Sequence, residues 1–294
     1  MYYRRKILLG LLQIFGGSLT KLDLQKYLFL LNQEKDIPFY EFIPYKFGCY
    51  SFQANQDLST LNKYKIVKES DIFWNLEDKT NYLNQLKIHD RILITKFYQQ
   101  FHELRGDALI KYVYENYPYY AIHSIIAEKL LGAKKHKTVL NRKPKGTDQT
   151  LFTIGYEGKT VEYFTNQLIN ADVKVLCDVR KNPVSMKYGF SKNQLKFIVE
   201  NVGIKYIHFP KLGIASDKRK VLNTKNDYDR LFSDYEENTL RTEETELEKL
   251  YQILLSNKRI ALTCFEADHN YCHRSKTAIA LSVKFENNYT VKHI

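Results

Sequence analysis

The chain has 294 residues, which is enough for two ordinary domains, and its hydrophobic fraction of 44% argues against disorder. No apolar run reaches the ~18 residues of a membrane span, and the four cysteines show no disulfide framework, so we expect a cytoplasmic protein without a membrane partner. The net charge of +12, with 23 tyrosines and 17 phenylalanines, favours a polyanion such as nucleic acid, although a generally basic proteome gives the same composition.

The N-terminal segment MYYRRKILLGLLQIFGG has basic residues followed by a short apolar run, as in a signal peptide. It has no small-x-small cleavage site, and the apolar residues from Arg4 to Phe15 follow helical spacing, so we expect an amphipathic helix there. Ser18 or Thr20 can cap a second helix, which runs to about Gln33.

A third short helix and a strand follow a proline-containing loop. Ser51 can cap the helix, which ends near the apolar pair Ile66-Val67. The stretch DIFWNL, residues 71–76, predicts a strand of a β-wing. Three short helices and a wing indicate a winged helix, in which the last helix enters the major groove of DNA.

Three stretches of this first part resemble a known type of domain. LTKLDLQKYLFLLNQ, IPYKFGCYSFQANQDLSTL and YVYENYPYYAIHSII are similar to N-terminal winged-helix segments of prokaryotic proteins with regulatory or defence-like architectures. The side chains of the third helix that we expect to bind nucleic acid are Gln53, Asn55, Gln56, Ser59, Asn62 and Lys63. A solvated helix face and a protein-binding module remain open as alternatives.

Residues 83–131 predict further helices, and a cluster of tyrosines there indicates packing or a homodimer surface. These tyrosines are Tyr112, Tyr114, Tyr117, Tyr119 and Tyr120. From Gly132 to Thr150 the sequence has six lysines and arginines against one acid and no apolar period. We therefore expect a winged-helix and helical domain over residues 1–131, a basic linker over 132–150, and a second domain over 151–294.

Strands and helices alternate in the second domain. The predicted strands are LFTIGY, VKVLCDVR, IKYIHFP, RIALTCFE and YTVKHI. Because they are almost continuously apolar and separated by helices, they predict a small Rossmann-like α/β domain whose mostly parallel sheet is covered on both faces. Ligands bind such sheets beyond the carboxyl ends of the strands.

Polar residues follow four of the predicted strands, where this rule expects a ligand site. In chain order they are Tyr156 and Glu157, Asp178 and Arg180, His208, then Cys264 and Glu266, with Cys272-His273-Arg274 opening the next helix. We expect Arg180, Glu266 and Arg274 to share one cleft.

The same stretches carry a second resemblance. TIGYEG, DVRKNPVS, GFS, GIKYIHFPKLG and CFEADHNYCHR closely resemble domain of unknown function (DUF) family 488, over residues 151–294. The resemblance implies a small Rossmann-like domain and a set of matching residues, but no reaction. The matching residues are Tyr156, Glu157, Asp178, Arg180, Pro183, Ser185, His208, Leu212, Gly213, Cys264, Glu266, Cys272, His273 and Arg274.

The Cys272-His273-Arg274 corner allows several interpretations. A helix N-terminus lowers a thiol pKa and binds phosphate. A phosphatase loop would place its arginine about six residues after the cysteine, whereas here it follows by two. Zinc could use Cys264, His269, Cys272 and His273, but that spacing is unlike common zinc patterns, so we expect no metal and no cofactor.

A structural corner is also open, in which Cys272 packs inward and Arg274 pairs with Glu266 or Asp178. The long polar stretch from Lys211 to Tyr235 reads either as a solvated loop or, through Lys218-Arg219-Lys220, as a phosphate clamp.

The interpretation that we carry forward is a pocket for a nucleotide or another anion. The residues expected to be catalytic are Asp178, Glu266, Cys272, His273 and Tyr156. Those expected to bind substrate are Glu157, Arg180, Ser185, Lys187, His208 and Arg274. We expect a hydrolase or transferase that acts on a glycosidic or phosphoester bond, targeted to DNA rather than RNA, in defence or repair. The alternatives are a non-enzymatic transcriptional regulator that senses a nucleotide-like anion and a protein-interaction module.

Overall fold

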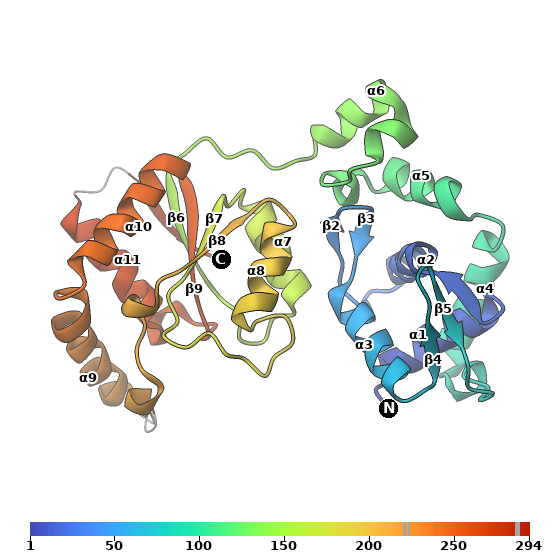
Figure 1. Ribbon diagram of the computed structural model, residues 1–294, viewed down its shortest axis with the longest axis horizontal. Helices are drawn as coiled ribbons and strands as arrows, with labels where there is room; N and C mark the ends of the chain where they lie inside the picture. Colours follow the sequence, from blue (N-terminus) through green and yellow to red (C-terminus); the bar gives the residue numbers. More distant parts are fainter. Residues whose placement is uncertain (220–221, 223, 286–288) are drawn as a thin grey trace. The chain divides into compact units, whose positions relative to one another are not determined.

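A computed structural model describes all residues except 220–221, 223 and 286–288 (Figure 1). The chain forms two compact units, Met1–Lys143 and Pro144–Ile294, so the boundary falls inside the predicted basic linker. The first part of that stretch is helical instead: Gly132, with a positive φ of 73°, kinks the helix, and the residues after it, which include three lysines and a leucine, resume the helix to Leu140. Lys220 of the predicted clamp lies outside the described residues.

The N-terminal unit is helical with two small antiparallel sheets (Figure 1). Its helices are α1 (Tyr3–Ile14), α2 (Lys21–Gln33), α3 (Phe52–Lys63), α4 (Ile88–Phe101), α5 (Gly106–Asn116) and α6 (Ala127–Leu140). Its strands are β1 (Ser18–Thr20), β2 (Ile43–Tyr45), β3 (Gly48–Tyr50), β4 (Val67–Glu69) and β5 (Phe73–Leu76). One sheet has the order β1-β5-β4, and β2 pairs with β3 in a hairpin.

The predicted helix caps are present. The Thr20 hydroxyl accepts a hydrogen bond from the Asp23 N–H at the start of α2, and the Ser51 hydroxyl accepts one from the Ala54 N–H at the start of α3. Ser18 instead donates to the Asn75 side chain in β5. The sequence did not predict the β2–β3 hairpin, because its strands have three residues each and one of them contains Pro44.

A buried carboxylate fixes α3 against α1. Asp57 on α3 is fully buried and accepts hydrogen bonds from Arg4 at 2.6 Å, Arg5 at 2.9 Å and the Tyr40 hydroxyl at 3.0 Å. Hydrogen bonds to charged groups stabilise more than neutral ones, so this contact holds the orientation of α3 within the unit.

The C-terminal unit is built on a five-stranded parallel sheet, as predicted. Its strands are β6 (Thr150–Gly155), β7 (Val175–Asp178), β8 (Lys205–His208), β9 (Arg259–Cys264) and β10 (Thr290–His293). The spatial order is β10-β6-β9-β7-β8, and every pair is parallel. In a dinucleotide-binding Rossmann sheet the first strand lies beside the second and the fourth. Here the first strand, β6, lies beside the fourth and the fifth, so the strand order differs.

Helices cover both faces of this sheet (Figure 1). They are α7 (Val161–Asn170), α8 (Lys192–Glu200), α9 (Lys225–Tyr235), α10 (Glu244–Asn257) and α11 (His273–Lys284). The helices α7 and α8 lie on one side, and α10 and α11 lie on the other. No helix in the described part of the chain is long and apolar enough to cross a membrane.

The polar stretch from Lys211 to Tyr235 is partly helical. A capping box between Thr224 and Asp227 starts α9, and buried Phe232 and Tyr235 dock this helix on the core. Of the two readings left open for this stretch, a solvated loop does not describe residues 225–235, which form α9.

Candidate site at the carboxyl edge of the parallel sheet

The strand register gathers the predicted strand-end residues at one edge of the sheet. Asp178 of β7 lies beside His208 of β8 and Thr263 of β9, and Gly155 of β6 lies beside Cys264 of β9. Two connected groups of side chains result: one is centred on Asp178 and Arg180, and the other on Cys264, Cys272 and His273.

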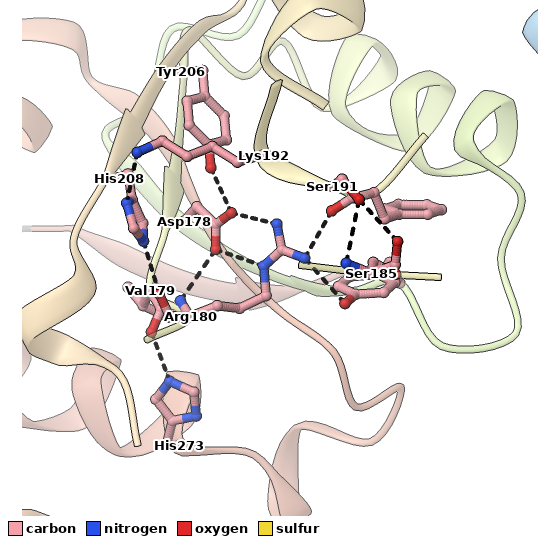
Figure 2. A network of polar contacts seen from close by, with 11 residues as sticks. Asp178, Val179, Arg180, Ser185, Ser191, Lys192, Tyr206, His208 and His273 are labelled. Atoms are coloured by element: carbon pink, nitrogen blue, oxygen red, sulfur yellow. Dashed lines mark hydrogen bonds and ion pairs between the residues drawn. The ribbon is translucent and has the colours of Figure 1, made fainter. Parts of the chain in front are cut away.

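The first group is a buried ion pair (Figure 2). Both Asp178 oxygens bind the Arg180 guanidinium, Asp178 Oδ1 also accepts the Arg180 backbone N–H at 3.1 Å, and Oδ2 accepts the Tyr206 hydroxyl at 2.6 Å. Burial, followed by the charge of Asp178, raises the pKa of Tyr206, so this phenol stays a donor. Asp178 is fully buried and Arg180 is 5% exposed, so their charges are satisfied inside the protein.

Tyr156 belongs to the same group. Its hydroxyl accepts a hydrogen bond from Arg180 Nη1 at 3.0 Å, and its ring stacks on Phe190 with 4.4 Å between centroids. Its backbone carbonyl accepts the Lys187 ammonium at 2.9 Å. The Tyr156 ring is 4% exposed, so these contacts use the aromatic surface that a nucleobase would stack on.

Two histidines hold the backbone that follows β7 (Figure 2). His208 Nε2 lies 2.9 Å from the Arg180 carbonyl oxygen, and its Nδ1 lies 3.1 Å from the Lys192 ammonium. His273 Nε2 lies 3.0 Å from the Val179 carbonyl oxygen. Each carbonyl requires an N–H on the ring nitrogen that faces it, which leaves Nδ1 of both rings with a lone pair.

The second group brings two thiols and an imidazole together. The ligand atoms of Cys264, Cys272 and His273 all lie within 4.8 Å of one another, and all three residues are buried. Cys264 Sγ is 3.6 Å from His273 Nδ1 and 3.3 Å from Glu266 Oε2. Arg219 closes the group, with one N–H on Glu266 at 2.8 Å and another on His273 Nδ1 at 2.8 Å.

The titration of this group is uneven. Burial raises the pKa of the Cys264 thiol, but the hydrogen bond from Cys272, the His273 ring and the Arg219 charge outweigh it and hold that pKa well below its usual value. Burial and the neighbouring Cys264 raise the pKa of Cys272. Burial, then the Cys264 charge, also raise the pKa of Glu266. The two thiols therefore differ in acidity, and Cys264 is the more acidic of them.

Arg274 clamps the loop that carries Glu266. It is 1% exposed and donates to the carbonyl oxygens of Glu266 and Ala267, rather than to a carboxylate. The Glu157 carboxylate accepts the Ala267 N–H at 2.9 Å from the other side. This loop passes close to the end of β6, and only a glycine at position 155 leaves room for it. A Cβ at Gly155 would lie 1.8 Å from the Glu266 carbonyl oxygen.

The loop between β7 and α8 is held by two serines. The Ser191 hydroxyl donates to the Ser185 carbonyl at 2.8 Å and accepts the Ser185 N–H at 3.3 Å (Figure 2). Ser191 stands at the N-cap position of α8, but its side chain does not cap the helix. The Ser185 hydroxyl accepts the Lys187 N–H, so both serines shape this loop.

Arg180, Glu266 and Arg274 thus lie at the same sheet edge, but in two adjoining groups rather than around one open cleft. Sequence reasoning left Tyr206 and Arg219 out of the site. The only signals were the position of Tyr206 two residues before His208 and the basic cluster around Arg219.

Two cavities border these groups. One of about 190 Å³ is lined by Lys181, Lys211 and Lys218, among others. A larger one of about 880 Å³ lies between α9, α11 and β10, and Cys272 forms part of its wall.

In the N-terminal unit, the six predicted nucleic-acid-binding residues all lie on α3. Lys63 is exposed and the other five are half-buried. The Gln53 amide donates to Asp57 at 3.5 Å, and Asn62 Oδ1 accepts the Glu69 N–H of β4 at 3.3 Å. Of the predicted tyrosine cluster, Tyr114 is fully buried, as expected for packing.

The C-terminal unit is therefore a parallel α/β domain with a buried Asp–Arg pair and a thiol–imidazole group at its carboxyl edge. Residues 160–281 match the family described as "Domain of unknown function DUF488", so the chain contains a DUF488 domain there. No curated protein and no solved structure matches the chain. The predicted resemblance is confirmed over this range, which excludes β6 and β10.

Proposed function

We propose that the protein binds nucleic acid through its N-terminal unit and that the edge of its parallel sheet binds and processes a nucleotide or nucleic-acid segment. The observation that carries this proposal is the element order α1, β1, α2, α3, β4 and β5, with the β2–β3 hairpin inserted between α2 and α3 and with the sheet order β1-β5-β4. Three helices packed with a small antiparallel sheet are the parts of a winged-helix domain.

In this proposal α3 is the recognition helix. Asn55, Gln56, Ser59, Asn62 and Lys63 recur every three or four residues, so they share one helix face. Amide side chains can pair with adenine edges in the major groove, and a lysine with guanine or phosphate.

The phosphate contacts would come from the end of α6 rather than from the wing. The end of β4 and the β4–β5 turn contain Glu69 and Asp71 beside a single lysine, Lys68, which disfavours a phosphate backbone there. The exposed basic residues at the end of α6 and just after it are Lys134, Lys135, Lys137, Arg142, Lys143 and Lys145.

At the sheet edge, lysines favour an anionic ligand. Lys211 pairs with Glu243 and Lys218 with Asp234, whereas no carboxylate in the described part of the chain pairs with Lys181. Because all three line the 190 Å³ cavity, a phosphate group of the ligand could replace the missing partner of Lys181.

For the reaction we propose hydrolysis or transfer at a glycosidic or phosphoester bond, with Glu266 as the proton-transferring group. Its raised pKa brings a carboxyl closer to neutral pH, where acid–base catalysis is most effective. His273 and Cys272 adjoin it. Asp178, Arg180 and Tyr156 are given positioning roles, because their polar groups bind one another.

The second candidate function is a regulator that senses a nucleotide-like anion without turning it over. The Asp178–Arg180–Tyr156 network favours this function, because its polar groups bind one another. Such a network can couple a bound ligand to the position of the surrounding backbone, but it offers no free nucleophile. The two functions differ in one observable, which is product formed from a bound nucleotide or oligonucleotide.

The DNA-binding part is tested by fluorescence anisotropy of the full chain with labelled duplex DNA and duplex RNA. We expect Asn55→Ala to weaken binding to its preferred DNA by the roughly 1–3 kcal/mol of a bidentate base contact. The matched control is Asn193→Ala on exposed α8. Equal loss in both variants, or no duplex binding at low salt, would contradict the proposal.

The ligand site is tested separately by calorimetry with adenosine and guanosine phosphates. We expect Lys181→Gln to weaken binding of a nucleotide at least about tenfold, because it loses a charge-assisted contact. Lys205→Gln, an exposed lysine at the opposite end of β8, should bind as the wild type does. Lack of any heat of binding with all nucleotides would exclude them as ligands of this site.

A further inference from the structure

The side chains of Cys264, Glu266, Cys272 and His273 come from three short segments that converge. Cys264 ends β9, Glu266 follows two residues later, and Cys272 and His273 open α11. Adjacent residues rarely ligate one ion, because successive side chains diverge. Here Cys272 is extended, with φ −132° and ψ 133°, and His273 is the first helical residue, so the chain turns between them. This turn brings both donors next to Cys264 Sγ.

The separations agree with a tetrahedral metal site. A zinc ion with bonds of roughly 2.0–2.3 Å to oxygen, nitrogen and sulfur leaves its ligand atoms roughly 3.3–3.8 Å apart. Cys264 Sγ lies 3.6 Å from His273 Nδ1 and 3.3 Å from Glu266 Oε2. The ligand atoms of Cys264, Cys272 and His273 all lie within 4.8 Å of one another, so they would have to close by about 1 Å at most around an ion.

The imidazole is also oriented as a metal ligand requires. His273 Nε2–H donates to the Val179 carbonyl, which directs the Nδ1 lone pair toward Cys264. Metal-bound histidines commonly donate their second N–H to a carbonyl or carboxylate in this way. The ring is fully buried, which keeps water from this lone pair.

A cation already occupies part of this space. The Arg219 guanidinium bonds to His273 Nδ1 and Glu266 Oε1, two of the four residues in question. The positive charge of Arg219 lies beside Cys264, Glu266 and His273, where a divalent ion would also lie. It therefore compensates the same negative charge that the ion would compensate.

We propose that Cys264, Cys272 and His273 bind a soft divalent cation of the zinc type beside Glu266, with Arg219 displaced from His273. Binding releases the thiol protons to solvent, so that both cysteines coordinate as thiolates. This inference goes beyond the proposed function and does not depend on it. The spacing of these residues along the chain predicted no metal, whereas the turn at the start of α11 brings the donors together.

The test uses the full chain without a histidine tag, kept reduced by a phosphine. After dialysis against Zn²⁺ and then metal-free buffer, we expect about one zinc per chain by plasma emission spectrometry. Co²⁺ in place of zinc should give a thiolate-to-cobalt charge-transfer band together with tetrahedral d–d bands. Zinc well below stoichiometric amounts, or cobalt spectra without the charge-transfer band, would overturn the proposal.

Variants locate the ion. We expect Cys264→Ser and Cys272→Ser each to bind zinc at least about 100-fold more weakly than the wild type. Loss of a residue that only supports a ligand typically costs about 10–100-fold, so a larger loss identifies a direct ligand. Cys177→Ala is the matched control, because Cys177 is an equally buried thiol on neighbouring β7. Unchanged zinc affinity in both serine variants overturns the assignment. So does a Cys264–Cys272 disulfide that mass spectrometry still finds in the wild-type protein kept under the phosphine. If the serine variants fail to fold, the wild-type cobalt spectrum decides.

Arg219→Ala tests the displacement. The guanidinium competes with the metal for His273 Nδ1, so we expect its removal to strengthen zinc binding. Weaker binding in this variant would show that Arg219 supports the ion instead, and would overturn that part of the proposal.

Discussion

At the scale of single residues, the buried Asp178–Arg180 pair is the clearest determinant of the sheet edge. Removing one partner of a buried ion pair leaves the other charge without compensation. We expect Arg180→Leu to lower the free energy of unfolding of the C-terminal unit by about 3–5 kcal/mol, measured by denaturant unfolding followed by circular dichroism.

The control for this change is Lys174→Ala, whose ammonium pairs with Asp172 nearer the surface and should matter by about 1 kcal/mol or less. The double variant Asp178→Leu with Arg180→Leu should recover part of the loss, because no lone charge remains buried. An Arg180→Leu protein of unchanged stability that no longer binds nucleotides would instead assign Arg180 a direct contact with the ligand.

Lys159 makes stability depend on pH. Burial, and then the charge of Arg274, lower its pKa from 10.5 to about 8. Between these values the unfolded chain binds more protons at this site than the folded chain, so folding becomes more favourable as pH rises. Denaturation midpoints measured from pH 8 to 10.5 should rise less steeply in Lys159→Gln than in the wild type. Parallel curves would show that Lys159 titrates normally.

At the scale of elements, the crossing of β6 and the loop after β9 depends on Gly155. A methyl group there would meet the Glu266 carbonyl at 1.8 Å, and a backbone atom cannot rotate away. We expect Gly155→Ala to destabilise the C-terminal unit and to displace the loop that holds the Cys264 group.

Gly10→Ala in α1 is the comparison for Gly155→Ala. Its new Cβ would meet the flexible ends of Leu86, at 3.1 Å, and Leu83, at 3.5 Å, and alanine favours a helix. Thermal unfolding should separate the two variants, and equal midpoints would contradict the steric explanation.

The elements also show what the sequence could predict. The sequence predicts the five parallel strands and the helices α7, α10 and α11. Apolar runs and helical spacing can be recognised from neighbouring residues alone. The β2–β3 hairpin and α9 were not predictable, because their short apolar contacts acquire meaning only from the elements they pack on. Likewise, the strand-end positions of Asp178, Arg180 and Cys264 were predictable. Their partners Tyr206 and Arg219 were not, because strand order and loop path bring them there.

At the scale of the whole molecule, the proposed contact with DNA depends on charge. Replacing Lys134, Lys135 and Lys137 with glutamine should reduce the slope of log affinity against log salt by about 0.9 for each lysine that touches phosphate. Titrations at several salt concentrations measure this slope. Three exposed lysines of the C-terminal unit, Lys205, Lys249 and Lys292, serve as the control set. An unchanged slope in the first variant would place the phosphate contacts elsewhere.

The position of β9 in the middle of its sheet has a consequence for biosynthesis. Residue 150 of β6 pairs with residue 259, and β7 meets β6 only through β9. A nascent chain therefore leaves both edges of β6 and one edge of β7 unpaired until β9 and β10 have left the ribosome, whereas the first 143 residues can already collapse into their own core. The late-arriving strand closes the sheet and delivers Cys264 in the same step. Chains interrupted before residue 259 should accordingly aggregate through these unprotected edges rather than persist as smaller folded proteins.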